Sequence, residues 1–197
     1  MDYINGVWRS RDGSQSITMM ELAAQLAGQQ PHPLNTMTEA TVGATYPNGC
    51  HVAEVEIDPE TGVTRIVNYT TADDCGNVMN HTIVEGQVHG GVVQGAGQVF
   101  GEHAVYDEDS GQLLAGSFGD YFMPHAGFVP VIRVGDYAVP SAGNALGAKG
   151  AGESGCTASI PALVSAVLDA LRPLGITHLD MPLTPDKVWC AIKAAQG

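Results

Sequence analysis

Apolar and polar residues alternate over positions 53–58, and positions 63–70 are rich in β-branched and aromatic residues. Both patterns predict strands over 51–58 and 63–70, and the intervening Pro59-Glu60-Thr61-Gly62 has the composition of a turn. These residues therefore predict an antiparallel hairpin. Further strands are predicted at 36–45 and 129–134. Shorter hairpins are predicted at the start of the chain, with turns at Asn5-Gly6 and Asp12-Gly13, and over residues 102–115 across an acidic turn.

Four segments carry helix signals. A short helix is predicted at 19–26, with Ser16 or Thr18 as its cap, and a long one at 81–101 behind Asn80. Pro161 is predicted to open an apolar helix over 162–171, and Thr184-Pro185-Asp186 is predicted to begin a last helix over 187–195. Because hairpins are interspersed with helices, the pattern favours an α+β fold with mixed or antiparallel sheets over a doubly wound parallel sheet. We expect one domain over residues 1–197, which could comprise two lobes.

The long segment at 81–101 is an unusual helix because it is rich in glycine. At 100° per residue, one narrow face collects Gly86, Gly90, Gly97 and Gly101. A stripe beside that face collects Gln87, Gln94 and Gln98. Such a helix is expected to be buried, with a second backbone or a ligand close against the glycine face. Tight helix packing and binding of a polar planar ligand through the glutamine amides both fit this pattern.

Charge and cysteine usage narrow the class of protein. The chain has 21 acidic and 8 basic residues, a net charge of −13, so it would repel nucleic acid. Four widely spaced cysteines form no CxxC pair, which indicates a reduced, cytoplasmic protein and argues against an iron–sulfur cluster or zinc site held by this chain alone. The histidines lie too far apart to converge on a metal. We expect no apolar run of transmembrane length and hence no membrane partner.

The nine residues GAKGAGESG, Gly147 to Gly155, form the most informative loop. Four glycines ahead of an apolar helix allow close approach of a ligand to backbone N–H groups. The spacing matches neither a GxxxxGK[ST] phosphate loop nor a GxGxxG dinucleotide loop. Glu153 is the single carboxylate among these small residues. It could form a surface pair with Lys149, four residues earlier, or it could face a pocket as a general base.

Four motifs occur in one order along the chain: VEGQVHGGVVQGAGQ, YDEDSGQLLAGSFGDYFMP, GAKGAGESG and MPLTPDKVW. In this order and spacing the chain resembles the molybdenum hydroxylases, which include xanthine dehydrogenase, aldehyde oxidase and aerobic carbon monoxide dehydrogenase. The resemblance runs from about residue 46 to residue 192. It implies the C-terminal part of a molybdopterin-binding large subunit, with the α+β fold of that domain around the buried glycine-rich helix.

The resemblance also implies a site. Glu153 matches the family's catalytic base beside molybdenum, which activates the water-derived oxygen that attacks an electron-poor carbon of an N-heterocycle or aldehyde. Gln87 matches a residue that contacts the pterin, and Lys149, Gly150, Ala151 and Gly152 match the loop beside the cofactor. The implied cofactor is molybdenum-molybdopterin in its cytosine dinucleotide form. Electrons would pass to 2Fe-2S clusters and FAD on partner chains, and no protein side chain of this segment would ligate the metal.

The chain departs from the family pattern in two small ways and one large way. Asn80-His81 stands where many members have Asn-Pro, and Ser154-Gly155-Cys156 follows Glu153 where many have proline or other small residues. The family's upstream Gly-Gly-Phe-Gly cofactor loop is not among the 197 residues. We therefore expect the rest of the molybdopterin-binding subunit, an Fe-S subunit and an FAD subunit as partners, and no activity of this chain alone. A split subunit and a fragment both fit, and the Met1 start favours the split subunit. The alternative is a non-catalytic assembly module that holds no molybdenum.

Overall fold

The computed structural model describes residues 1–39, 41 and 43–197. The chain divides into two units, Met1–Thr41 and Val42–Gly197, which are described separately. Both contain strands followed by helices, and the sheets are antiparallel in the first unit and mixed in the second. The α+β fold predicted from the sequence is confirmed.

The first unit is a three-stranded antiparallel sheet with one short helix. Strands β1 (Asp2–Ile4), β2 (Val7–Arg9) and β3 (Ser16–Thr18) pair in sequence order. Asn5 and Gly6 turn between the first two strands with φ of 51° and 82°, as a two-residue hairpin loop requires. Helix α1 (Met19–Gln25) follows, and Thr18 and Glu21 form a reciprocal capping box at its start. The predicted hairpins and cap are confirmed.

The strand predicted at 36–45 is not formed at residues 36–39, 41 and 43–45. Ala40 and Val42 lie outside the described residues. The described residues of this segment are almost all exposed and pair with no neighbouring strand. Local strand propensity is therefore not sufficient here, because a strand also needs a partner with which to pair.

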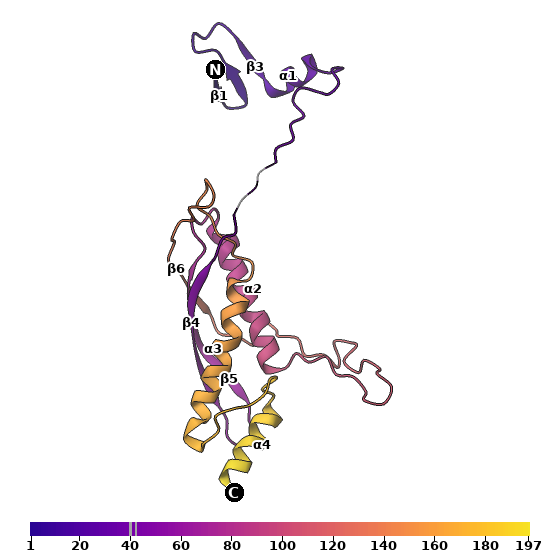
Figure 1. Cartoon of the computed structure of the whole chain (residues 1–197), viewed down its shortest axis with the longest axis vertical. Helices are drawn as coiled ribbons and strands as arrows, with labels where there is room; N and C mark the ends of the chain where they lie inside the picture. The colour runs from indigo at the N-terminus through magenta and orange to yellow at the C-terminus, as the bar shows by residue number, and fades with distance from the viewer. Residues whose placement is uncertain (40, 42) are drawn as a thin grey trace. The chain divides into compact units, whose positions relative to one another are not determined.

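The second unit contains a mixed sheet in the order β4-β5-β6 (Figure 1). Strands β4 (Asn48–Ile57) and β5 (Thr64–Asp74) form the predicted hairpin, closed by Gly62 at a φ of 72°. Strand β6 (Ile132–Asp136) pairs parallel to β5. It begins later than the predicted 129–134 because Pro130 cannot donate a ladder hydrogen bond. A parallel pair needs a long crossover, and residues 75–131 provide it.

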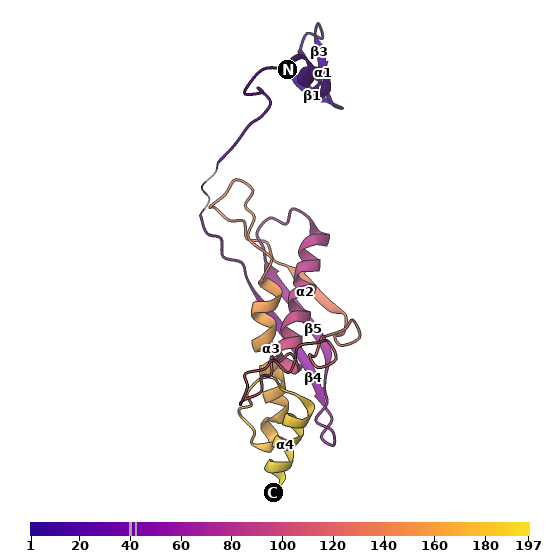
Figure 2. The ribbon, with the colours of Figure 1, turned by 90° about the vertical axis from the view of Figure 1, so that its right-hand side faces the viewer.

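Two long helices lie side by side on one face of this sheet (Figures 1 and 2). Helix α2 (His81–Phe100) begins at Asn80, whose side chain accepts a hydrogen bond from the Ile83 amide at 3.1 Å. Helix α3 (Ser154–Leu171) packs against α2 and β4, and the short 3-10 helix η1 (Arg172–Leu174) ends it. Helix α4 (Pro185–Gln196) starts with proline in its first turn, as predicted.

Helix α3 corrects two expectations. It begins at Ser154, eight residues before the predicted start, and Pro161 lies inside it. Proline costs one backbone hydrogen bond there and is exposed, so the run of small residues before it still forms helix. The helical residues Ser154–Leu174 also number 21 and have a mean hydropathy of 1.4, so by length and composition alone they could cross a membrane. The expectation that no apolar run reaches transmembrane length is therefore wrong. A core helix has the same composition, and Leu163, Val167 and Leu171 of α3 are buried in the core.

The contact face of α2 also differs from the prediction. A Cβ at Gly91 would stand 2.6 Å from the Cys156 amide nitrogen of α3, and a Cβ at Gly95 would collide with Ser159 Oγ. At Gly86 and Gly90, a Cβ would meet nothing within 4 Å. Helix packing therefore uses positions 88, 91, 92 and 95, spaced as one helical stripe. The predicted glycine face is wrong at Gly86 and Gly90, whereas a Cβ at Gly97 or Gly101 would collide with Glu102 or Phe122 of the crossover segment. The expected burial therefore holds mainly for the second half of α2.

The core of the second unit lies between the sheet and these helices. Its members are buried apolar side chains from β5, β6, α2, α3, α4 and the segment before α4: Ile66, Tyr69, Val88, Val92, Ala96, Val99, Phe100, Ile132, Leu163, Val167, Leu171, Leu183, Val188 and Ile192. The crossover segment after α2 is held by a hydrogen bond of 2.8 Å from the Tyr121 hydroxyl to Glu102. Because α2 and α3 both contribute buried side chains to this core, the core fixes the position at which the two helices meet.

Candidate functional site

Glu153 is the N-cap residue of α3, where the glycine-rich loop becomes helix. Its main-chain carbonyl accepts hydrogen bonds of 3.0 Å from both the amide and the hydroxyl of Thr157. Its side chain is exposed and makes no cap hydrogen bond. Within the described residues the carboxylate also has no ion-pair partner. The backbone of Glu153 is therefore fixed by the helix, while its carboxylate is directed to the outside.

Gln87 comes from the second turn of α2 and lies beside the same loop. A Cβ at Gly152 would stand 4.0 Å from Gln87 Oε1, so the amide of Gln87 is just beyond the backbone of Gly152. At Gly150 a Cβ would meet nothing within 4 Å. The loop thus presents uncovered backbone next to a primary amide, which can both donate and accept hydrogen bonds.

A close helix crossing brings these two segments together. A Cβ at Gly155, in the first turn of α3, would collide with the Val88 carbonyl and stand 3.1 Å from the Cα of Gly91. Only glycine at both positions permits this separation of the backbones. Because Val88 follows Gln87 and Gly155 follows Glu153 by two residues, the crossing places the Gln87 and Glu153 segments side by side.

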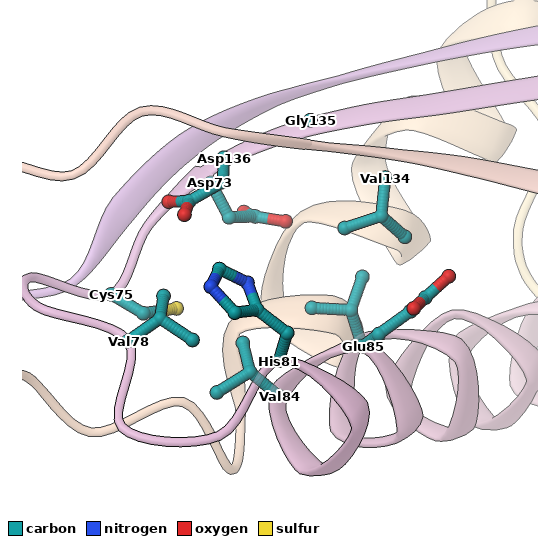
Figure 3. Close-up of a pocket in the computed structure, with 10 residues that line it drawn as sticks. Asp73, Cys75, Val78, His81, Val84, Glu85, Val134, Gly135 and Asp136 are labelled. Atoms are coloured by element: carbon teal, nitrogen blue, oxygen red, sulfur yellow. The ribbon is translucent and has the colours of Figure 1, made fainter.

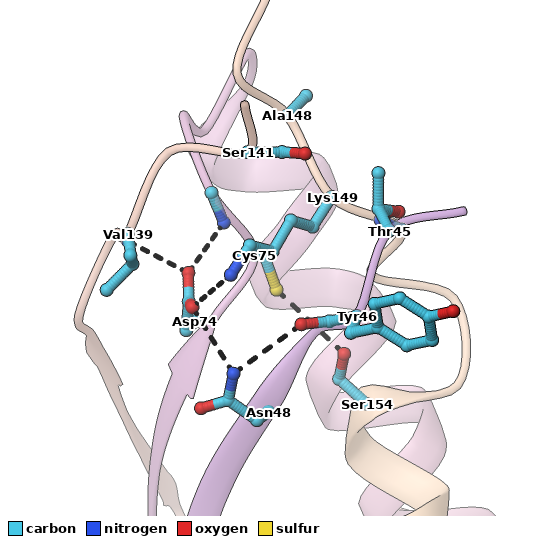
Figure 4. Close-up of polar contacts among 12 residues, drawn as sticks. Thr45, Tyr46, Asn48, Asp74, Cys75, Val139, Ser141, Ala148, Lys149 and Ser154 are labelled. Carbon is cyan, nitrogen blue, oxygen red and sulfur yellow. Dashed lines mark hydrogen bonds and ion pairs between the residues drawn. The ribbon is translucent and has the colours of Figure 1, made fainter. Parts of the chain in front are cut away.

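Lys149 has a different partner from the one that its spacing to Glu153 suggested. Its ammonium lies 2.5 Å from Asp74 Oδ2, and the two side chains are only 11% and 7% exposed (Figure 4). Asp74 also accepts hydrogen bonds of 2.9 Å from the amides of Gly76 and Val139. The surface pair between Lys149 and Glu153, considered from the sequence, is therefore not formed.

The neighbours of Asp74 determine its charge. The Lys149 side chain, and then the Val139 and Gly76 amides, lower the pKa of the Asp74 carboxyl to about 2. A carboxylate that accepts several N–H bonds and faces an ammonium stays ionised through most of the acid range. Asp74 is thus a charged junction that joins the end of β5, the segment before the loop and the loop itself.

The backbone of the loop is pinned next to this junction. The Lys149 amide donates to the Cys75 carbonyl at 2.9 Å, and Gly76 bridges to Ala148. Gly76 has a φ of 63°, and a Cβ there would collide with the Gly147 carbonyl, so this position requires glycine. The first half of the glycine-rich loop is therefore rigidly attached to β5, whereas residues 150–153 project beyond the attachment.

Three of the six predicted site residues come together, and the other three have separate contacts. Gln87, Gly152 and Glu153 come together at the α2–α3 crossing. The Lys149 side chain points inward to Asp74. Gly150 forms one long contact, 3.4 Å from its amide to Thr45 Oγ1, and Ala151 accepts from the Ser154 amide at 3.4 Å.

Asp74 was missed in the sequence. The signal was present, because two consecutive acids, Asp73 and Asp74, end a strand of mainly uncharged residues, and buried carboxylates need cationic or N–H partners.

These residues fit a polar, planar ligand. The loop backbone at Gly150 and Gly152 is open at the positions where side chains would otherwise project, and the Gln87 amide and the Glu153 carboxylate carry the polar groups. Such a surface can take hydrogen bonds from a heterocycle while keeping a base beside it.

Comparison with known proteins identifies the family. Residues 1–130 match the model of the molybdopterin cofactor-binding domain. The chain belongs to this family, and hence to the molybdenum hydroxylases, as the four ordered motifs predicted. The cofactor class predicted from the motifs, molybdenum bound to molybdopterin, is the one that this family description names.

Individual relatives agree with this assignment. The chain is 38% identical over 187 residues to the carbon monoxide dehydrogenase large chain of Hydrogenophaga pseudoflava, a match that covers 92% of this chain and 23% of that protein. It is 40% identical over 167 residues to the nicotine 6-hydroxylase large subunit of Paenarthrobacter nicotinovorans, covering 85% and 20%. The chain therefore spans about a quarter or less of the length of these relatives.

Solved structures show the same fold. The Cu,Mo-CO dehydrogenase in its carbon monoxide reduced state matches with a TM-score of 0.74 and 30% identity, over 99% of this chain and 25% of that chain. Quinoline 2-oxidoreductase from Pseudomonas putida 86 matches with a TM-score of 0.72 and 40% identity, over 75% and 19%. The arrangement of α2 and α3 on the mixed sheet is thus that of molybdenum hydroxylases.

Proposed function

We propose that this chain forms one wall of the molybdenum cofactor site in a molybdenum-dependent oxidoreductase, with Glu153 as the general base and Gln87 as a contact to the pterin. The observation that carries the proposal is the α2–α3 crossing. It brings Gln87, Gly152 and Glu153 together although they come from two separate motifs, and two glycine contacts in the backbone fix the crossing.

The residues of this wall would divide the work of holding the cofactor. The Gln87 amide would hydrogen-bond polar atoms at the edge of the pterin, and the exposed backbone of Gly150, Ala151 and Gly152 would lie against it. Lys149 would contribute through its backbone and through its ion pair with Asp74, which attaches the loop to β5. Precise placement of this kind matters because small displacements of binding groups cost large factors in rate.

Glu153 would move the proton. When bound, the molybdenum centre would supply oxygen-transfer and two-electron chemistry. The Glu153 carboxylate, held by its helical backbone and unpaired within the described part of the chain, would accept the proton of the water-derived nucleophile. Its position at the start of α3, next to the uncovered loop, leaves room for a substrate with an electron-poor carbon, such as an N-heterocycle or an aldehyde.

The rest of the site would come from partners. The relatives are large chains or subunits of which the matched segment covers 23% and 20%. We infer that the remaining molybdopterin-binding polypeptide completes the pocket, that the cofactor is the cytosine dinucleotide form, and that 2Fe-2S and FAD subunits carry the electrons away. The chain would then be inactive alone.

Metal and nucleotide analysis of the complex that co-purifies with this chain tests the proposal. Molybdenum at about one atom per complex, together with a cytidine nucleotide released on denaturation, is the expected result. A complex that contains every partner subunit but neither molybdenum nor nucleotide would contradict the proposal. That result would favour the alternative, an assembly module that never holds the cofactor.

A further inference from the structure

One cavity of the second unit is lined by none of the residues assigned to the cofactor wall. It has a volume of about 130 Å³ and opens between the ends of β5 and β6 and the first turns of α2 (Figure 3). Three carboxylate residues line it, Asp73, Glu85 and Asp136, together with the imidazole of His81. None of the described residues that line it is a lysine or an arginine.

Asp73, which lines this cavity, has a buried carboxylate oxygen that lacks a hydrogen-bond partner among the described residues. Its side chain is 6% exposed, and one carboxylate oxygen lies 3.3 Å from His51 Nε2, whose own side chain is 0% exposed. The other oxygen, Oδ2, is buried and finds no hydrogen-bond partner in the described part of the chain. In Figure 3 the Asp73 and Asp136 side chains lie next to each other on one side of the cavity, and the His81 ring lies on the other side. A buried carboxylate oxygen without a donor is costly, so a donor from outside would be stabilising here.

The walls of the cavity favour an organic cation over a metal ion. Besides the acids, valine side chains from β6, α2 and the segment before α2 line it: Val78, Val84, Val88 and Val134. Hard cations such as Ca²⁺ and Mg²⁺ need a shell of oxygen ligands. Among the described residues, no group of three or more histidines, cysteines or acids is arranged to hold a metal. A lysine or arginine side chain would fit this lining, because its methylene groups can pack against the valines while its charged group bonds the carboxylates.

The basic residues of the second unit are engaged elsewhere. Arg65 pairs with Glu56, Arg133 bonds Asn68, Lys149 pairs with Asp74, Arg172 pairs with Asp169, Lys187 bonds the Asp180 carbonyl, and Lys193 lies over the Trp189 ring. The other two basic residues, Arg9 and Arg11, belong to the first unit. The cation for this cavity must therefore come from outside the unit that forms it.

We propose that this cavity binds the side chain of a lysine or arginine from the polypeptide that packs against this chain. The acidic balance of the chain complements a basic partner, and a relative of which the matched segment covers 23% has further polypeptide to supply one. The proposal goes beyond the cofactor wall, since it uses none of the residues assigned there and holds whether or not molybdenum is bound.

Carbodiimide labelling of carboxylates with glycine amide, read by mass spectrometry, tests the proposal. The isolated protein is labelled in mildly acidic buffer with 10 mM methylguanidinium, with tetramethylammonium or with Mg²⁺, all at equal ionic strength. Methylguanidinium should lower labelling of Glu85 and Asp136 by more than about half if its Kd is on the order of millimolar. Asp180, whose side chain is 87% exposed, is the internal control and should not change.

The variant Asp73→Asn should remove most of this protection. If that variant does not fold, Asp136→Asn, at an exposed position, serves instead, with Glu85 as the reporter. Equal protection by tetramethylammonium, stronger protection by Mg²⁺, or unchanged protection in the variants would overturn the cation site.

The assembled complex tests the source of the cation. With the partner polypeptides in place, Glu85 and Asp136 should be protected without any added probe. Labelling in the complex at the rate of the isolated protein would overturn the assignment to a partner side chain. Protection of the isolated protein without probe would also overturn it, because the cation would then come from this chain itself. Neither readout depends on molybdenum content, so failure here is distinguishable from failure of the proposed function.

Discussion

Two neighbouring glycines of α2 should respond in opposite directions to the same substitution. Gly90 is exposed, and a Cβ there meets nothing within 4 Å. Gly91 is buried, and a Cβ there stands 2.6 Å from the Cys156 nitrogen and 2.9 Å from Gly155 atoms, all of them backbone. Because ordinary van der Waals contact begins near 3.4 Å, α2 and α3 would have to separate by about 0.8 Å to accept Gly91→Ala.

The magnitudes follow from these contacts. Replacing glycine by alanine inside a helix contributes about 0.8–1.0 kcal/mol of helix propensity, and Gly90→Ala should gain that amount. At Gly91 the same gain is opposed by overpacking, which costs typically about 1–3 kcal/mol and sits at the upper end when the obstacle is backbone. The net expectation is a loss of roughly 2 kcal/mol for Gly91→Ala and a difference of roughly 3 kcal/mol between the two variants.

Thermal unfolding followed by circular dichroism measures this difference. For a protein of this size, about 2–4 °C accompanies each kcal/mol, so the two midpoints should differ by roughly 6–12 °C. Gly86→Ala is a second control and should behave like Gly90→Ala, because its Cβ also meets nothing within 4 Å. If Gly91→Ala were as stabilising as Gly90→Ala, α2 and α3 would not meet on this face, and the juxtaposition of Gln87 and Glu153 would lose its basis.

Two further predictions concern ionisable groups. The ion pair with Lys149 lowers the pKa of Asp74 from 3.8 to about 2, so its contribution to stability is fully present above pH 3.8 and is lost as the pH falls through about 2. Asp74→Asn should therefore flatten the stability–pH curve between these values in acid unfolding experiments, and an unchanged curve would show that the pair is not formed. Burial raises the pKa of the Cys75 thiol, whereas Cys50 and Cys190 are exposed. Iodoacetamide should modify the two exposed thiols at least about tenfold faster than Cys75 by peptide mapping, and equal rates would contradict the burial of Cys75.

Local signals in the sequence were sufficient for most elements of the fold. The Asn5-Gly6 turn, the Thr18 and Asn80 caps and the turn ending at Gly62 are short-range features, and each occurs as predicted. The strand at 36–45 failed because a strand depends on a pairing partner, which local strand propensity does not reveal. The start of α3 failed because Pro161 was read as a first-turn residue, although an exposed proline can be accommodated inside a helix.

The motif order predicts Gln87 and Glu153 as members of the candidate site, but it does not predict the geometry of that site. Only the fold shows that the Gly91–Gly155 contact brings their segments together. The spacing of Lys149 and Glu153 suggested a local pair, whereas the partner of Lys149 is Asp74, 75 residues away in sequence. A long-range ion pair of this kind has no periodic signature, and its only trace in the sequence is a pair of acids at the end of a strand.

The proposed catalytic role of Glu153 is tested most directly by turnover per molybdenum atom in the assembled complex, for wild type and for Glu153→Gln. Glu60→Gln, in an exposed turn, is the matched control. The variant should keep its molybdenum and its fold but lose activity by at least about 10²–10⁴-fold, the range for removal of a general base. A Glu153→Gln complex that retains molybdenum and more than half of the wild-type turnover would contradict the assignment of Glu153 as the base.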